Sequence, residues 1–146
     1  MAQSSLDSLT KPIEKLYAGL PAIPVAWRDV IVAVSPWLAL IFGVLGVFGS
    51  LSAFGISTVL SPLVVLGGGV GTATSLIAVS VIGLVTSVLM LIAFPSLLKR
   101  KMLGWKYLFW AELLGIVSSV VSLTITGVVL GLVWLYFLFQ IKPAYK

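Results

Sequence analysis

The sequence contains no cysteine and no histidine, and only 9% of its 146 residues are charged. Without thiol or imidazole groups, the chain excludes disulfides, Cys/His metal or haem sites, and Ser-His or Cys-His nucleophilic pairs. The four acidic residues are too scattered to predict a paired-carboxylate active site or a calcium cage: Asp7, Glu14, Asp29 and Glu112. We therefore expect a non-enzymatic protein with no catalytic residue, no metal and no cofactor.

Hydrophobic residues make up 60% of the chain, and a soluble domain would carry roughly 25% charged residues. No charge occurs from Val30 to Leu98, and only Glu112 is charged between Tyr107 and Ile141. The first block has room for two crossings of about 20 residues each. The second would be about 51 Å long as one helix, so it predicts a hairpin that turns within residues 122–127. The sequence thus predicts an all-α, polytopic membrane protein with four transmembrane helices, at 31–51, 72–94, 107–122 and 125–141.

The basic residues predict the orientation of this four-helix bundle, which occupies residues 30–146. With four crossings all nine fall on one side: Lys11, Lys15, Arg28, Lys99, Arg100, Lys101, Lys106, Lys142 and Lys146. The positive-inside rule then places both termini in the cytoplasm. Three crossings would leave the two C-terminal lysines outside, which is the poorer solution.

Residues 1–29 predict a cytoplasmic amphipathic helix followed by a proline-containing linker. Apolar residues recur at steps of three and four, and Pro21 stops the pattern: Leu6, Leu9, Ile13, Leu16 and Leu20. We expect this helix to lie in the membrane interface, with a partner helix or a solvated cap on the bundle as alternatives.

Two proline-containing stretches interrupt the apolar blocks. Residues 52–71 are broken by Pro62 and by glycines at 67–69 and 71, so they predict a non-spanning connection with a short helix at 62–66 and a glycine hinge. Re-entry of this connection into the membrane stays open. Pro36 predicts a kink in the first spanning helix, or its true start with Ser35 as the cap.

Small residues recur at helical spacing and predict faces where membrane helices can pack closely. These faces contain Ala39, Gly43, Gly46 and Ser50; Ser80, Gly83 and Ser87; Ala111, Gly115 and Ser118; and Gly127 and Gly131.

Glu112 is the one ionisable residue within the predicted hydrocarbon region, where a charge is costly. Helical spacing places it on a small, polar face with Gly115 and Ser119, and a hairpin would bring Gln140 and Tyr136 of the last helix close to its depth. One hypothesis is a proton- or cation-binding carboxylate. The alternative is an interfacial carboxylate that ties its helix to the last helix or to Lys101 and Lys106.

The basic connection at Lys99, Arg100, Lys101 and Lys106 is a candidate site for anionic lipid head groups. Its other interpretation is that it only orients the chain. No basic stripe on a soluble face suggests nucleic acid.

The C-terminal third also carries a resemblance. Its segments Leu97-Leu98-Lys99-Arg100-Lys101, Gly104 to Phe109, Phe139 to Lys142 and Tyr145-Lys146 resemble small, uncharacterised bacterial membrane proteins with four helices. The resemblance implies the bacterial inner membrane and brings no activity or functional residues.

Two functions follow as hypotheses. The first is a membrane scaffold or accessory subunit that self-associates, or joins a larger membrane complex, through its small-residue faces. The second is a small homo-oligomeric, proton-coupled transporter of cations or amphiphiles that uses Glu112.

Overall fold

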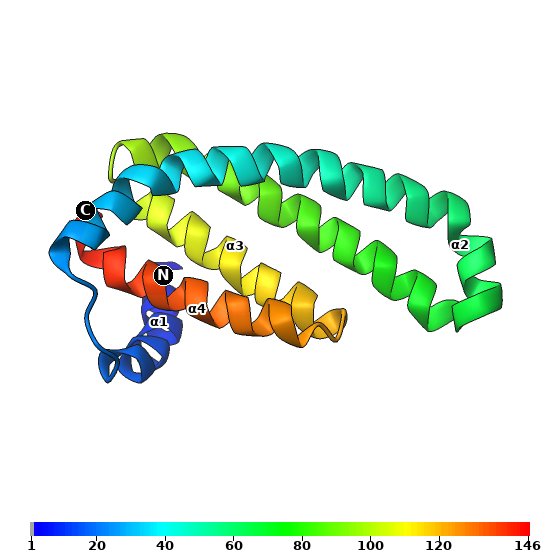
Figure 1. Ribbon diagram of the computed structural model, residues 1–146, viewed down its shortest axis with the longest axis horizontal. Helices are drawn as coiled ribbons and strands as arrows, with labels where there is room; N and C mark the ends of the chain where they lie inside the picture. Colours follow the sequence, from blue (N-terminus) through cyan, green and yellow to red (C-terminus); the bar gives the residue numbers. More distant parts are fainter. Residues whose placement is uncertain (1) are drawn as a thin grey trace.

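The computed structural model describes residues 2–146, with side chains from residue 8 onward. The elements of this part of the chain are helical: α1 (Ala2–Ala18), α2 (Val25–Leu98), α3 (Met102–Val121), α4 (Ile125–Ile141) and a 3-10 turn, η1 (Lys142–Ala144). The prediction of an all-α fold is confirmed. Figure 1 shows α2 folded back on itself beside the α3–α4 hairpin, with α1 near one end.

α2 reverses direction at Gly69, inside the glycine run where a hinge was expected. Gly69 has φ 82° and ψ 169°, a backbone conformation that is essentially restricted to glycine. Residues 25–68 therefore form an outgoing arm and residues 70–98 a return arm. Close contacts join the two arms, because a Cβ added at Gly43 or Gly46 would meet Leu91 or Ser87 within 3 Å.

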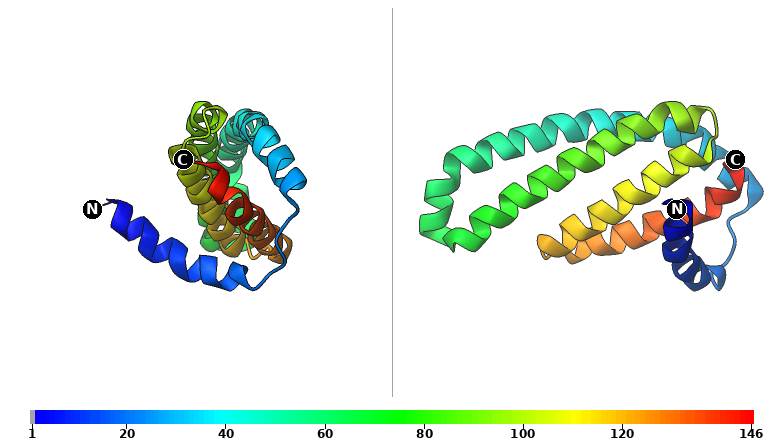
Figure 2. Two further views of the ribbon diagram at one scale, coloured as in Figure 1. Left: turned by 90° about the vertical axis from the view of Figure 1, so that its left-hand side faces the viewer. Right: turned by 180° about the vertical axis from the view of Figure 1, so that it is seen from behind.

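The structure corrects the predicted break at residues 52–71. The outgoing arm starts at Val25 and stays helical to Gly68, so Pro36 is not a helix start and no break in the helix precedes residues 62–66. Figures 1 and 2 show that the last turns before the reversal bend across the far end of the molecule, in the region where the short helix was expected. The return arm likewise continues beyond the predicted end at residue 94, to Leu98.

Serine side chains explain why the helix passes through two of its prolines. Each proline removes the N–H that would bond the carbonyl four residues earlier. Ser61 Oγ donates to the Thr58 carbonyl at 2.9 Å, and Ser35 Oγ donates to the Val32 carbonyl at 3.1 Å. In both Ser-Pro pairs a hydroxyl therefore replaces the missing donor, and the helix continues.

α3 and α4 form the predicted hairpin. α3 begins at Met102, five residues before the predicted start at 107, whereas α4 coincides with the predicted range 125–141. In the turn Leu123 has a φ of 54°, and the Thr124 N–H donates to the Ser119 carbonyl at 2.8 Å. This bond caps a carbonyl that the last turn of α3 leaves free.

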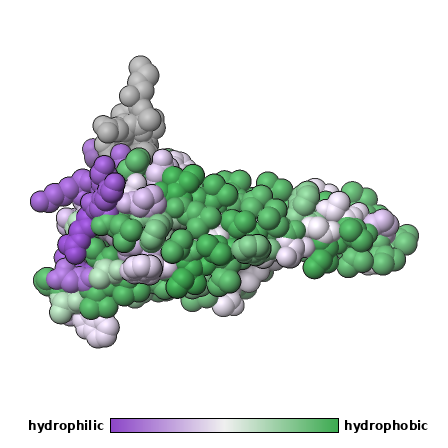
Figure 3. Space-filling view, turned by 90° about the horizontal axis from the view of Figure 1, so that it is seen from above, coloured by the Kyte–Doolittle hydropathy of each residue, from purple (hydrophilic) through white to green (hydrophobic). Residues whose placement is uncertain are grey.

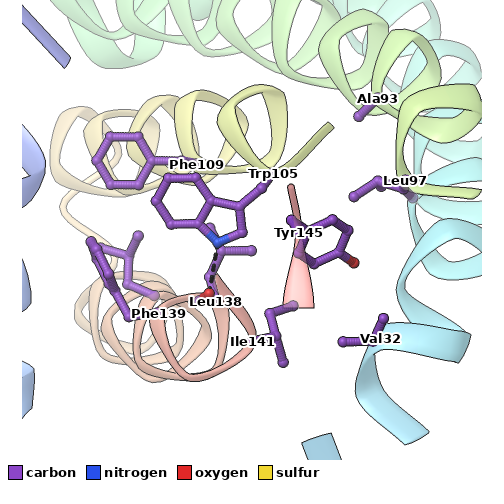
Figure 4. Packing of buried hydrophobic residues seen from close by; sticks show 11 residues of the cluster. Val32, Ala93, Leu97, Trp105, Phe109, Leu138, Phe139, Ile141 and Tyr145 are labelled. Carbon is purple, nitrogen blue, oxygen red and sulfur yellow. Dashed lines mark hydrogen bonds between the residues drawn. The ribbon is translucent and has the colours of Figure 1, made fainter. Parts of the chain in front are cut away.

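The best-packed part of the protein is an aromatic cluster at the end of the molecule that carries the basic connection, shown in Figure 4. Trp105 is 2% exposed and stacks on Phe109 with ring centroids 5.5 Å apart, and Phe139 packs edge-on against Trp105 at 5.6 Å. Trp105 Nε1 donates to the Leu138 carbonyl at 2.7 Å. The Lys142 N–H bonds the Phe139 carbonyl, so the indole caps the last turn of α4.

α1 crosses α4 rather than running along it (Figure 2). Tyr17 stacks on Phe139 at 5.7 Å and donates its hydroxyl to the Leu132 carbonyl at 3.0 Å, and Glu14 pairs with Lys142 at 2.8 Å. Ile13 packs toward the core, but the remaining described leucines of the predicted apolar stripe are exposed: Leu9, Leu16 and Leu20. Leu6 lies outside the described side chains. α1 thus has a second apolar surface that the bundle does not cover.

Two helices, α2 and the segment Ile125–Ala144, are long and apolar enough to cross a membrane. Only 17% and 22% of their most apolar stretches are buried within the protein, whereas the core helix of a soluble protein would be mostly buried. α3, which carries Lys106 and Glu112, is not one of them. Figure 3 shows an apolar surface along the molecule and hydrophilic side chains gathered at one end.

Candidate functional site

A groove of about 670 Å³ lies among α2, α3 and α4. The two arms of α2 contact each other, the return arm contacts α3, and α3 contacts α4. The groove lies inside this arrangement, and one of its walls is the outgoing arm while another is α4. These two walls are tied together at the basic end, which we define as the end that carries Arg28, the connection at 99–101, Lys142 and Lys146.

Two hydrogen bonds make this tie. Arg28 Nη2 donates to Gln140 Oε1 at 3.0 Å, and the hydroxyls of Ser35 and Tyr145 are 2.8 Å apart. Because the single hydroxyl hydrogen of Ser35 goes to the Val32 carbonyl, Tyr145 is the donor in the second bond. Farther from the basic end, Phe42 of the outgoing arm and Trp134 of α4 are 53% and 49% exposed. The groove therefore opens sideways between these two elements.

Glu112 is the one ionisable residue that lines the groove, and the other lining residues are apolar, aromatic or hydroxyl-bearing. The side chain is half-buried, and its Oε1 lies 3.3 Å from the Cβ position that a side chain at Gly131 would occupy. Within the described part of the chain the carboxylate has no hydrogen bond and no ion pair. It therefore faces the groove without a protein partner.

The structure does not bring the predicted partners of Glu112 to it. Gln140 accepts its hydrogen bond from Arg28, and the Tyr136 hydroxyl donates to the Pro21 carbonyl. Ser119 donates to the Gly115 carbonyl at 3.0 Å and faces Gly127. The predicted hydrogen bond from Gln140 is not formed, because Arg28 at the start of α2 reaches that amide. The alternative ties of Glu112 to Lys101 or Lys106 are also not among the described ion pairs.

Three hydroxyl groups of the groove were not singled out as binding groups by the sequence. Serine and threonine in these helices commonly donate to a carbonyl three or four residues back, as Ser80 and Ser87 do. Ser50, Thr86 and Ser118 line the groove without a described hydrogen bond from their side chains, and Thr86 Oγ1 is buried. With Glu112, they form a set of unpaired polar groups in an otherwise apolar groove, which we call the polar lane.

The small residues predicted to pack helices lie mostly at helix contacts. Ala39, Gly43, Ser80 and Gly131 are buried, and a Cβ at Gly46, Gly83, Gly127 or Gly131 would come within 3 Å of a neighbouring side chain. Gly115 differs, because a Cβ there would meet nothing within 4 Å and the residue lines the groove. Gly115 and Ser118 of the small-residue face of α3 thus line the groove, whereas Ala111 of the same face is buried.

The predicted lipid cluster is exposed at the connection between α2 and α3. Lys99, Arg100 and Lys101 are exposed and Lys106 is half-buried. The last residue folds onto this connection, since the Lys146 N–H donates to the Arg100 carbonyl at 3.0 Å and the Met102 N–H donates to the Lys146 carbonyl at 2.6 Å. These bonds bring the basic C-terminus to the same surface.

Comparisons with protein-family models, curated proteins and solved structures find no match to this chain. The resemblance to small bacterial membrane proteins therefore stays a prediction. No group of three or more His, Cys, Asp or Glu residues among residues 2–146 forms a metal site. The groove and its polar lane are therefore the features that indicate a function.

Proposed function

We propose that this chain is an integral membrane protein with four crossings and both termini on the cytoplasmic side of the bacterial inner membrane. The outgoing arm at 25–68 contains 44 residues and the return arm at 70–98 contains 29, so each exceeds the about 20 residues that a crossing requires. The α3–α4 hairpin supplies the other two crossings. Support comes from the exposed apolar surface and from the basic residues at one end of the molecule (Figure 3).

In this setting, we propose that the groove binds a cation at Glu112 and that the protein is a non-enzymatic, proton-coupled transporter, active as a small homo-oligomer. The observation that carries this proposal is a carboxylate without a protein partner, facing an open groove. An ionised carboxylate away from bulk water requires a counter-charge, or else a proton. Exchange of a proton for a cation at one carboxylate couples the two fluxes.

Proteoliposomes with an acidic interior and an entrapped pH-sensitive dye test this proposal. Sodium, potassium, choline or ethidium is added outside in turn, and we expect at least one of them to dissipate the pH gradient. Glu112→Gln should abolish this exchange because it removes the charge. Glu14→Gln, which alters an exposed carboxyl of α1 outside the groove, should retain it. Proton flux with all four cations that is unchanged by Glu112→Gln would refute the proposal.

A second candidate function is a scaffold or accessory subunit, which the outer part of α2 favours. The α2 hairpin extends beyond the α3–α4 turn (Figure 1), and its apolar side chains there are strongly exposed: Val59 at 77% and Leu66 at 84%. Such a surface suits contacts with lipid, with another copy or with a larger membrane complex. A Glu112→Gln variant that loses stability, in a protein without cation-dependent proton flux, would support this candidate.

A further inference from the structure

The polar lane and the shape of the groove also indicate what kind of cation fits. We infer that the groove takes a single-chain amphiphile whose ammonium group carries N–H bonds, and that this ligand enters from the bilayer between the outgoing arm and α4. This inference rests on the proposed function and narrows its substrate class.

The charge of the groove determines the sign of the ligand. Glu112 is the one ionisable lining residue, and α2 and α4 contribute no titratable side chain to the lining. A cation thus complements the groove, and a neutral or anionic ligand would leave the carboxylate without a counter-charge.

The hydroxyl groups favour a cation with hydrogen-bond donors. The contact between Gly104 and Leu97 sets the antiparallel register of α3 and the return arm, which places Thr86 near the level of Gly115. Gly115 is about 4.5 Å along the axis of α3 from Glu112. Thr86 lines the groove although its Oγ1 is buried, so its side chain has to rotate about χ1 to present this oxygen to a ligand. A primary ammonium has three N–H donors, so it can bond the carboxylate and, after this rotation, the Thr86 oxygen as well. A quaternary ammonium has no donor and would leave the buried Thr86 hydroxyl unpaired, which costs affinity.

The remaining lining favours an apolar chain on that ammonium. Aromatic and aliphatic side chains cover most of the groove, including Phe42, Trp134 and Phe137. A volume of about 670 Å³ lies within the range of roughly 300–1,000 Å³ that is usual for small-molecule sites. A small hydrophilic cation would fill only the polar lane and would leave the apolar lining without a partner.

The two ends of the groove differ in access. The basic end is tied by the Arg28–Gln140 and Ser35–Tyr145 hydrogen bonds and carries positive charge, which opposes the approach of a cation. The side opening is flanked by exposed apolar residues, among them Val34, Phe42 and Trp134. In a membrane this opening faces the acyl chains, where an amphiphile is already concentrated.

Binding of matched amines to the full chain in phosphatidylcholine nanodiscs at pH 7 tests the inference. The probes are dodecylammonium, dodecyltrimethylammonium with the same chain and no N–H, and ethylammonium with the same head group and no long chain. Binding is followed by tryptophan fluorescence, with empty nanodiscs to subtract partition into lipid. We expect dodecylammonium to bind at least tenfold more tightly than either of the other probes.

Variants place this binding in the groove. Thr86→Val should weaken dodecylammonium at least tenfold and should leave dodecyltrimethylammonium unchanged. The matched control is Thr74→Val on the same arm, whose hydroxyl already donates to the Val70 carbonyl, and it should bind like the wild type. Trp134→Phe should reduce the fluorescence change, because this indole lines the groove. Circular dichroism checks that each variant is folded.

Equal affinity for dodecylammonium and its trimethyl analogue would overturn the requirement for N–H donors, and equal affinity for ethylammonium would overturn the amphiphile. Either result, together with proton flux that still depends on Glu112, would leave the proposed transport function intact. Absence of binding and of Glu112-dependent flux would refute both.

Discussion

Gly104 offers the sharpest test of how α3 packs on the end of α2. The residue is buried in the first turn of α3, and a Cβ there would lie 2.7 Å from the Leu97 nitrogen and 2.9 Å from the Ser96 carbonyl carbon. Both atoms belong to the backbone, so no side-chain rotation can relieve the clash. Gly104→Ala must therefore shift the end of α2 away from α3.

Gly115→Ala is the matched control on the same helix, because its added Cβ would meet nothing within 4 Å. Both substitutions gain the helix propensity of alanine over glycine, about 0.5–1 kcal/mol. The difference between the two variants therefore isolates the steric cost. For one methyl group forced into a packed contact, this cost is about 1–3 kcal/mol.

The free energy of unfolding of both variants can be measured by titration with SDS in dodecyl maltoside micelles, followed by circular dichroism. We expect Gly104→Ala to be about 1–3 kcal/mol less stable than Gly115→Ala, and Gly115→Ala to be about 0.5–1 kcal/mol more stable than the wild type. Two variants of equal stability would show that the backbones do not approach closely at Gly104.

Two further predictions concern the basic end. Trp105→Phe removes the indole donor to the Leu138 carbonyl and should lower the free energy of unfolding by about 1–3 kcal/mol in the same assay. The control Trp110→Phe, on the exposed face of α3, should change it by less than about 0.5 kcal/mol. Equal effects of the two substitutions would contradict the capping role of Trp105. Burial raises the pKa of Tyr145, although the Ser35 hydroxyl, which can turn to donate to the phenolate, and the charge of Arg100 lower it in part. The folded state then prefers the neutral phenol. The contribution of Tyr145 to the free energy of unfolding is therefore fully present below about pH 10, and it is lost as the pH rises through the higher pKa of the folded state. The stability difference between wild type and Tyr145→Phe should therefore narrow above pH 10 in unfolding measurements, and a constant difference would refute this linkage.

Local patterns in the sequence predicted where the chain turns, but they did not predict where a helix continues without a break. The bounds of α4 and its turn from α3 coincide with the prediction, because polar residues and Gly127 interrupt two apolar stretches there. The reversal at Gly69 was foreseen from the glycine run. The predicted break around Pro62 and the alternative helix start at Pro36 were wrong, because the serine before each proline supplies a hydrogen bond to the freed carbonyl. That compensation depends on a rotamer, which composition does not reveal.

Of the candidate site, the sequence predicted the central residue but not its surroundings. Glu112 stood out because it is the one charged residue in its apolar block, and that scarcity is visible in the sequence. Its surroundings were not predictable, because Arg28 and Gln140 pair across 112 positions of the chain and leave the carboxylate free. Likewise, whether a hydroxyl bonds its own helix, as Ser87 does, or stays unpaired, as Thr86 does, depends on tertiary packing.

The separation between the basic end and the groove has a consequence for how this protein can work. The aromatic cluster around Trp105 lies at one end, together with the hydrogen bonds from α2 to Gln140 of α4 and to Tyr145 after η1. The polar lane lies beyond them along the helices. Because the walls of the groove are joined at that end, they can separate farther out without disturbing the packed core. The ligand that we propose would therefore enter sideways at low cost in stability. Substitutions in the cluster should change unfolding, while substitutions in the polar lane should change binding.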